Sequence, residues 1–244
     1  MDLLGNHAIP LQFAAAETFS EGLAAVKVQG KGNSMWGYVD RKGQMTIPPR
    51  FELAGHFVNG IAPVKTKGHD GGLWGFIDKS GNFVISPQFN LVDTFADDFA
   101  AVQFDKGWDD FGLQPVSLTD SEQNGIWGFI NGMGVLSITP QFQEVSHFSE
   151  DIAAVRSREK WGYIDTTGEW IIPAKFDMAG HFSEGLALVG IEYGKNTMAY
   201  GYINNRGDYV IEPQANIVAA SHFSENFCAT TVAKTWYERL NPFF

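Results

Sequence analysis

The sequence is poor in cysteine and in positive charge, and it has no long apolar run. Cys228 is the single cysteine in 244 residues, so no disulfide can form within the chain, and nothing indicates an oxidising compartment. No segment approaches the roughly 20 consecutive apolar residues that span a bilayer. The first ten residues lack the basic region and apolar run of a signal peptide. We therefore expect a soluble protein of the cytoplasm.

The shortage of positive charge excludes some partners. The 17 Lys and Arg residues stand against 28 Asp and Glu residues, which gives a formal charge of −11, and no basic cluster interrupts it. Phosphate backbones and anionic lipids would be repelled, so we expect no nucleic acid and no membrane insertion. The sequence also lacks HExxH, GxSxG, CxxC and a phosphate-binding glycine loop. We expect no enzyme activity, no cofactor and no metal.

An internal repeat organises the chain. A Trp-Gly dipeptide, replaced once by Tyr-Gly, recurs at positions 36, 74, 127, 161 and 200. It alternates with a marker phenylalanine that opens segments like FSEGLAAV, and this residue stands at positions 19, 57, 95, 148, 182 and 223. The period is about 40 residues, which is typical of a β-repeat architecture.

Three antiparallel strands are predicted for each unit. The first follows the marker phenylalanine, the second carries the Trp-Gly, and the third ends in a proline segment that suits a strand end or a sheet edge. A four-residue segment connects the second and third strands, and it begins with Asp or Asn and ends with Gly. This pattern predicts a type I turn with a glycine bulge. We expect the tryptophans in the core and the adjacent glycine to leave room for a neighbouring ring.

The two ends of the chain predict how the units are arranged. Ile9 to Phe13 match the third strand with no Trp-Gly before them, and Trp236-Tyr237 stand in a sixth Trp-Gly position. Six units result if the two ends combine, so we predict an all-β, six-bladed, propeller-like closed ring whose last unit is completed by the N-terminal strand. An open β-solenoid or superhelix is the alternative. The chain is then a single domain, residues 1–244, with units near 19–56, 57–94, 95–147, 148–181, 182–222, and 223–244 plus 1–18.

The repeated strings resemble those of a known family. WGYID, a glycine turn, an Ile-Pro strand and FSEGLA are similar to the WG repeats, also called KWG repeats, that occur widely in bacterial proteins. Departures are Tyr200 in a tryptophan position, Asn131 and Asn204 in aspartate positions, and Ala215 in a phenylalanine position. The resemblance implies an interaction or scaffold module, and it implies no shared catalytic residues.

Polar residues that recur with the repeat are interpreted as structural. His56, His147, His181 and His222 precede the marker phenylalanine, where the other two units have threonine, and each could satisfy a loop carbonyl. Members of a ring would lie too far apart to share one metal ion. The Ser-Glu pairs after the phenylalanine are interpreted as turn residues rather than as an acid and a base.

The insertion between residues 104 and 124 is the part that the repeat explains least. Its acidic and aromatic residues, Asp105, Trp108, Asp109, Asp110 and Phe111, are the candidate partner-binding residues. Aromatic anchors in an acidic frame suit a basic protein or a sugar. A solvated or self-packed loop is equally open, and a Ca²⁺ site from the three aspartates is a weaker possibility.

These observations favour a non-enzymatic protein-interaction or scaffold module that presents loops from a rigid acidic body, as a subunit of a larger assembly. The alternative is a glycan-binding or glycosidase-like propeller. A glycosidase would need lone carboxylates that break the repeat's symmetry, and the sequence has none outside the insertion.

Overall fold

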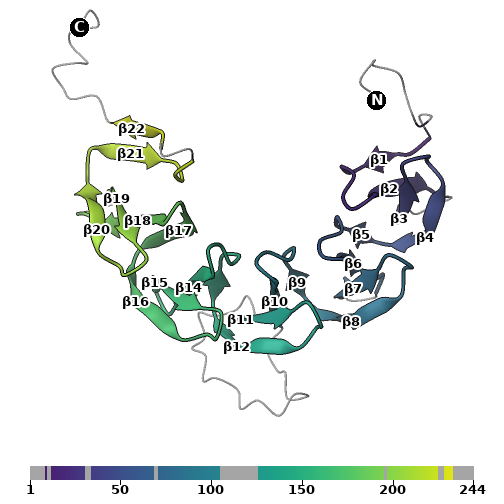
Figure 1. The fold of residues 1–244 in the computed structure, drawn as a ribbon, viewed down its shortest axis with the longest axis horizontal. Coiled ribbons are helices and arrows are strands. Elements are labelled where there is room, and N and C mark those ends of the chain that lie inside the picture. The colour runs from purple at the N-terminus through teal and green to yellow at the C-terminus, as the bar shows by residue number, and fades with distance from the viewer. Residues whose placement is uncertain are drawn as a thin grey trace, which may run out of the picture. The chain divides into compact units, whose positions relative to one another are not determined.

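The fold consists of β-strands throughout the described part of the chain. The computed structural model describes residues 9, 12–30, 34–68, 71–104, 126–194, 197–224 and 228–232. Every regular element in these ranges is a strand, which confirms the all-β prediction (Figure 1). Within them, no helix has the length and apolar character needed to cross a membrane.

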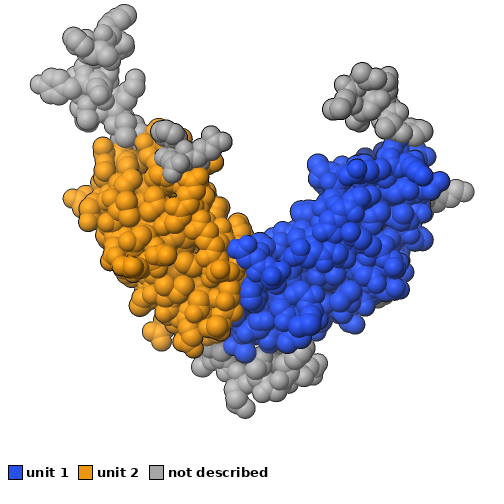
Figure 2. All heavy atoms as spheres, viewed as in Figure 1, with its two compact units in different colours: residues 1–140 blue, residues 141–244 orange. Residues whose placement is uncertain are grey.

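The chain forms two compact units, residues 1–140 and residues 141–244 (Figure 2). The strands of the first three sheets are β1 (Ala15–Ala16), β2 (Leu23–Gln29), β3 (Ser34–Asp40), β4 (Met45–Phe51), β5 (Leu53–Ala54), β6 (Ile61–Lys65), β7 (Trp74–Asp78), β8 (Phe83–Phe89), β9 (Leu91–Val92), β10 (Phe99–Phe104), β11 (Ile126–Asn131) and β12 (Leu136–Phe142). Those of the remaining sheets are β13 (Glu144–Val145), β14 (Ile152–Ser157), β15 (Lys160–Asp165), β16 (Trp170–Phe176), β17 (Met178–Ser183), β18 (Leu186–Glu192), β19 (Met198–Asn204), β20 (Tyr209–Gln214), β21 (Ile217–Ala220) and β22 (Thr230–Val232).

Five sheets share one antiparallel order of four strands, as in β5-β6-β7-β8, and in four of them the leading strand has only two residues, while β17 has six. The described residues of the sixth form the two-stranded sheet β21-β22. The three longer strands were predicted. The leading strand was missed, because in four sheets its two residues are too few to display an alternation of apolar and polar side chains. The prediction of a single domain stays a prediction.

The core is centred one residue beyond the Trp-Gly dipeptide. The aromatic residue that follows the glycine is at most 1% exposed in all five units, as Tyr38, Phe76, Phe129, Tyr163 and Tyr202. The phenylalanine that ends the third strand is buried as predicted in four units. Trp36 is 9% exposed, and Trp74, Trp127 and Trp161 are half-buried. The tryptophans therefore lie at the margin of the core, and their burial is less complete than predicted.

The glycine of the Trp-Gly dipeptide makes room for backbone in all five described repeats, and in one of them it also makes room for a ring, because a Cβ on Gly162 would lie 2.6 Å from Trp170 Cζ3. A Cβ on Gly37 would lie 2.5 Å from the Ile47 carbonyl oxygen and 2.8 Å from the Pro49 nitrogen. The third strand bulges there, because Tyr38 pairs with Ile47 while Trp36 pairs with Phe51. A side chain would collide with this bulge, so the position requires glycine.

The turn between the second and third strands forms as predicted. The Asp40 carboxylate accepts hydrogen bonds from the backbone N–H groups of Lys42 and Gln44, each 2.9 Å long. Gly43 has φ 78°, the left-handed conformation that favours glycine. The same pattern recurs at Asp78, Asn131, Asp165 and Asn204. These residues shape turns.

Two described residues of the N-terminal segment, Ile9 and Phe13, contact the first sheet. A Cβ on Gly43 would lie 2.8 Å from Ile9 Cγ2, and one on Gly81 would lie 3.0 Å from Ile47 Cγ2. Ile9 therefore contacts the hairpin turn of the first repeat in the same way as Ile47 contacts the hairpin turn of the second repeat. Phe13 packs against the buried Ala24, Val26 and Val39. The third-strand interpretation of this segment agrees with these contacts, while closure of a ring stays a prediction.

Candidate functional site: the Ser-Glu turns

The predicted partner-binding residues lie outside the described part of the chain. The structure does not describe residues 105–125, so the role of the predicted residues stays a prediction. These residues are Asp105, Trp108, Asp109, Asp110 and Phe111. Among the described residues, polar side chains gather at the turns that follow the marker phenylalanine. We call these turns, around residues 20–23, 58–61, 96–99, 149–152 and 183–186, the turn row.

Each of these turns is a tight two-residue connection. In the first, Ser20 and Leu23 exchange backbone hydrogen bonds of 2.9 and 3.0 Å. Between them, Glu21 (φ 49°) and Gly22 (φ 89°) are both left-handed, which is the geometry of a type I′ turn. Non-glycine residues adopt this conformation at a steric cost, so the surrounding contacts must hold them there.

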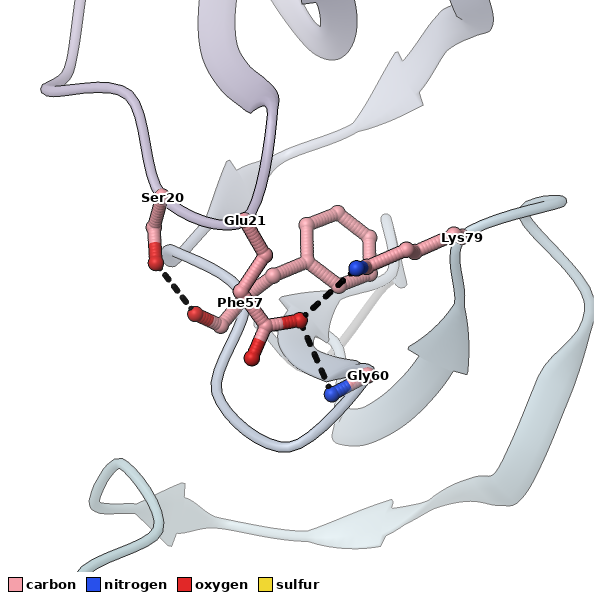
Figure 3. Close-up of polar contacts among 5 residues, drawn as sticks. All are labelled: Ser20, Glu21, Phe57, Gly60 and Lys79. Carbon is pink, nitrogen blue, oxygen red and sulfur yellow. Dashed lines mark hydrogen bonds and ion pairs between the residues drawn. The ribbon is translucent and has the colours of Figure 1, made fainter.

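Side chains of one turn hold the next turn of the row. Ser20 Oγ donates a hydrogen bond of 2.5 Å to the carbonyl oxygen of Phe57 (Figure 3). Glu21 Oε2 accepts a bond of 3.0 Å from the Gly60 N–H and lies 2.9 Å from Lys79 Nζ. The carboxylate of Glu21 in the first repeat thus accepts a hydrogen bond from the turn of the second repeat and pairs with a lysine in the hairpin of that repeat.

The same contacts recur in residues 141–244. Ser149 Oγ donates to the Phe182 carbonyl at 2.8 Å, and Ser183 Oγ donates to the Phe223 carbonyl at 2.8 Å. Glu150 accepts from the Gly185 N–H at 3.0 Å. The Ser-Glu pairs do lie in turns, as predicted, but their side chains join successive repeats, which sequence reasoning missed. The available signal was that other units form the same turn with Val58-Asn59 or Ala96-Asp97, so the turn itself requires neither Ser nor Glu.

An aromatic pair lies beneath each of these contacts. The marker phenylalanine packs edge-on against the aromatic residue after the preceding Trp-Gly, with centroids 5.0 Å apart for Tyr38–Phe57 and for Tyr163–Phe182. The Tyr38 hydroxyl donates to the Gly55 carbonyl at 2.7 Å, and that of Tyr163 donates to the Gly180 carbonyl at 3.0 Å. Burial raises the pKa of both tyrosines well above the usual value, so the hydroxyls stay protonated donors.

Three histidines lie side by side, closer together than was expected of positions predicted to be too far apart to share one metal ion. The ring centroids of His147 and His181 are 4.8 Å apart, and those of His181 and His222 are 3.9 Å apart with the planes inclined by 14°. Stacked rings turn their faces toward one another, whereas a metal ion is bound through nitrogen lone pairs in the ring plane. Among the described residues, no group of three His, Cys, Asp or Glu side chains is placed to hold a metal ion.

Six stretches of the chain match the family model described as "WG containing repeat". They are residues 1–31, 36–68, 74–108, 127–161, 161–193 and 200–236, which together make up most of the chain. The chain belongs to the WG-repeat family. The matched stretches carry the Trp-Gly or Tyr-Gly strands and the turn row, so the contacts between turns are contacts between WG repeats.

One solved structure with a weak likeness to these WG repeats is "Crystal structure of the tricorn protease". The TM-score is 0.31 at 10% sequence identity, over 86% of this chain and 26% of that chain. This chain therefore spans about a quarter of the protease's length, and so low a score supports no conclusion about fold or activity. No curated protein matches the chain.

Carboxylates of the WG repeats are held in the charged form. The Lys79 ammonium and the backbone N–H groups of Gly60 and Asn59 lower the pKa of Glu21, although burial opposes them. The Thr167 hydroxyl and three backbone N–H groups lower the pKa of Asp165. Such groups accept hydrogen bonds and carry negative charge at neutral pH, and a general acid would need the opposite shift.

Proposed function

We propose that this WG-repeat chain is a non-enzymatic protein-interaction or scaffold module, acting as a subunit of a larger assembly in the cytoplasm. The observation that carries the proposal is the use of the Ser-Glu side chains. Their hydrogen bonds run from one repeat to the next, so the polar groups that might have served acid-base chemistry hold the repeats together instead. Within each compact unit, repeats joined in this way present their loops at a fixed spacing.

The partner is a protein with a basic surface. The exposed residues of the turn row are mostly acidic, namely Glu21, Asp97, Asp98, Glu150, Asp151 and Glu184. Together with the net charge of −11, they favour positively charged partners through steering and complementarity. We further propose that the insertion of residues 104–124 provides the aromatic anchors, Trp108 and Phe111.

Affinity capture with the tagged full-length chain tests this proposal. The comparison is with a variant in which residues 105–122 are replaced by a short Gly-Ser turn, and with the double variant Trp108→Ala/Phe111→Ala. We expect a partner that the parent retains in a fixed molar ratio, that both variants lose, and that elutes as salt is raised. Equal retention by the parent and both variants would contradict the role of the insertion.

Glycan binding is the second candidate function, and the Trp108 and Phe111 pair within the acidic insertion is the observation that favours it. If neither the parent nor the variants retain a protein, a glycan array is the next measurement. A sugar bound by the parent and lost by the double variant would favour a lectin over a scaffold.

We also propose that the repeats close into a six-unit ring, with Ile9 to Phe13 as the third strand of the sixth unit. Support comes from the contact of Ile9 with Gly43, which repeats the contact of Ile47 with Gly81. Support also comes from Trp236-Tyr237, which the sequence places in the sixth Trp-Gly position. The body would then be a single domain.

A further inference from the structure

The histidine row, which we define as His147, His181 and His222, is formed by equivalent residues of three successive repeats. His147 lies between β13 and β14, His181 lies in β17, and His222 follows β21. All three belong to the compact unit of residues 141–244. His181 is the central ring, with a neighbour at 4.8 Å on one side and at 3.9 Å on the other.

Hydrogen bonds hold the backbone next to each of the three rings. Ser146 Oγ accepts a hydrogen bond from the Ala154 N–H at 3.0 Å, and Ser221 Oγ accepts one from the Ala229 N–H at 2.8 Å. The Tyr163 hydroxyl holds the carbonyl of Gly180, next to His181. The fully buried Phe148 and Phe182 follow His147 and His181. Contacts on both sides of each histidine therefore bring the rings together.

Protonation weakens the contact between stacked imidazole rings. Neutral rings pack face to face like other aromatic side chains, whereas two imidazolium rings at this spacing repel each other. Partial burial lowers the pKa of His181, and the charges of His222 and His147 lower it further. The Glu150 carboxylate acts in the opposite direction, and it is already an acceptor for the Gly185 N–H. Because the pKa is lowered on folding, stability is present above the unfolded value near 6.5 and is lost as pH falls below it.

We propose that the histidine row is a proton-sensitive contact that loosens the WG repeats of residues 144–224 on mild acidification, while leaving the repeats before residue 104 unchanged. The first compact unit supplies the internal comparison. The equivalent positions there are Thr18, His56 and Thr94, so no two histidines are neighbours in that series. An acid-sensitive half and an acid-insensitive half would follow from this difference alone.

Amide hydrogen exchange of the full-length chain at pH 7.5 and pH 5.5, corrected for intrinsic exchange rates, tests the proposal. We expect exchange within residues 144–157 and 178–192 to rise roughly five- to tenfold at the lower pH, with little change within residues 53–65. The variant His181→Thr should abolish this rise. The chain itself places threonine in this position at residues 18 and 94, so the substitution suits the local structure.

The control variant His56→Thr should keep the wild-type pattern. An equal acid response in His181→Thr, or an equal rise in both halves of the wild type, would overturn the proposal. A second measurement does not depend on how any variant folds. In an NMR titration of the imidazole Cε1–H signals of the wild type, the pKa of His181 should lie below the usual value near 6.5, and a midpoint at or above that value would also overturn the proposal.

Discussion

At the scale of single residues, the Trp-Gly dipeptide is explained by what the glycine meets. In each of five units, a Cβ at this glycine would lie 2.5 or 2.6 Å from a carbonyl oxygen of the third strand. The nearest atoms include backbone, which cannot rotate away as a side chain end could. The conformational freedom of glycine is not the reason for its presence, because no positive φ is recorded at these five positions.

Gly128→Ala is expected to lower the free energy of unfolding by about 2–4 kcal/mol, because the new methyl group collides with the Ile138 carbonyl and Pro140. The matched control is Gly132→Ala in the same hairpin, where nothing lies within 4 Å of the added Cβ. That change should be nearly neutral. Urea denaturation of both variants checks the prediction, and similar midpoints would show that the bulge yields easily.

Tyr163→Phe should lower the free energy of unfolding by about 1–2 kcal/mol, because the Gly180 carbonyl loses its donor. The ring itself should fit, since Phe76 and Phe129 occupy the same buried position in other units. Thermal denaturation at neutral pH measures the loss. A larger loss, comparable with that of Tyr163→Ala, would mean that the ring had moved.

At the scale of elements, the turn row shows how neighbouring sheets are joined. Three joints combine a serine hydroxyl on a carbonyl with an edge-on aromatic pair, and two of them add a glutamate on a backbone N–H. The partners are 33 to 40 residues apart in sequence, so each bond closes one repeat length. Repeat proteins gain stability from such nearest-neighbour interfaces as well as from each repeat itself.

Ser149→Ala should lower the free energy of unfolding by about 1 kcal/mol, because the Phe182 carbonyl is then left without the hydroxyl. Ser137→Ala is the control, since Ser137 Oγ makes only a 3.4 Å bond to the nearby Val135 carbonyl in an exposed turn. Chemical denaturation followed by tryptophan fluorescence reports both. The prediction fails if the two variants are equally stable.

The hairpin turns predict an acid-dependent stability of their own. The pKa of Asp165 is lowered from its usual 3.8, so its contribution is present above that value and is lost as pH falls through the folded pKa. Asp165→Asn should therefore show a shallower fall in Tm between about pH 5 and pH 3 than the wild type. Asn131 and Asn204 form the same turn elsewhere, so the variant should fold normally. A parallel pH profile in both proteins would argue against this role.

At the scale of the whole molecule, the two compact units differ in their recurring polar residues. Residues 141–244 have the histidine row and, among the fully described positions, Ser-Glu turns at 149–150 and 183–184, whereas residues 1–140 have such a turn at 20–21. In residues 141–244, Ser149 Oγ donates to the Phe182 carbonyl and Ser183 Oγ donates to the Phe223 carbonyl. The units should therefore respond differently to acid although they are built on the same repeat.

Deletion of residues 1–13 tests the ring. Loss of the Ile9 and Phe13 contacts should raise amide exchange in the first sheet, residues 15–51, whether or not the ring closes. If these residues also complete the sixth unit, exchange should rise in residues 217–232 as well. A rise confined to the first sheet would favour the open solenoid.

Local patterns in the sequence determined the repeat, three of the four strands of the five four-stranded sheets, the hairpin turns and the buried phenylalanine that ends the third strand. Alternation of side chains, turn residues and proline positions act over a few residues, so one chain segment suffices to predict them. The same patterns showed that the Ser-Glu pairs and the histidines recur at equivalent positions, but they did not show which residues these side chains contact.

Only the tertiary structure decided what those positions do. The collision that requires glycine after tryptophan comes from a bulge in the neighbouring strand. The reach of Ser20 to Phe57, and the stacking of His181 on His222, join residues of successive repeats. These contacts depend on how one sheet is placed on the next, and a periodic sequence specifies that equivalent residues recur without specifying how far apart they come to lie.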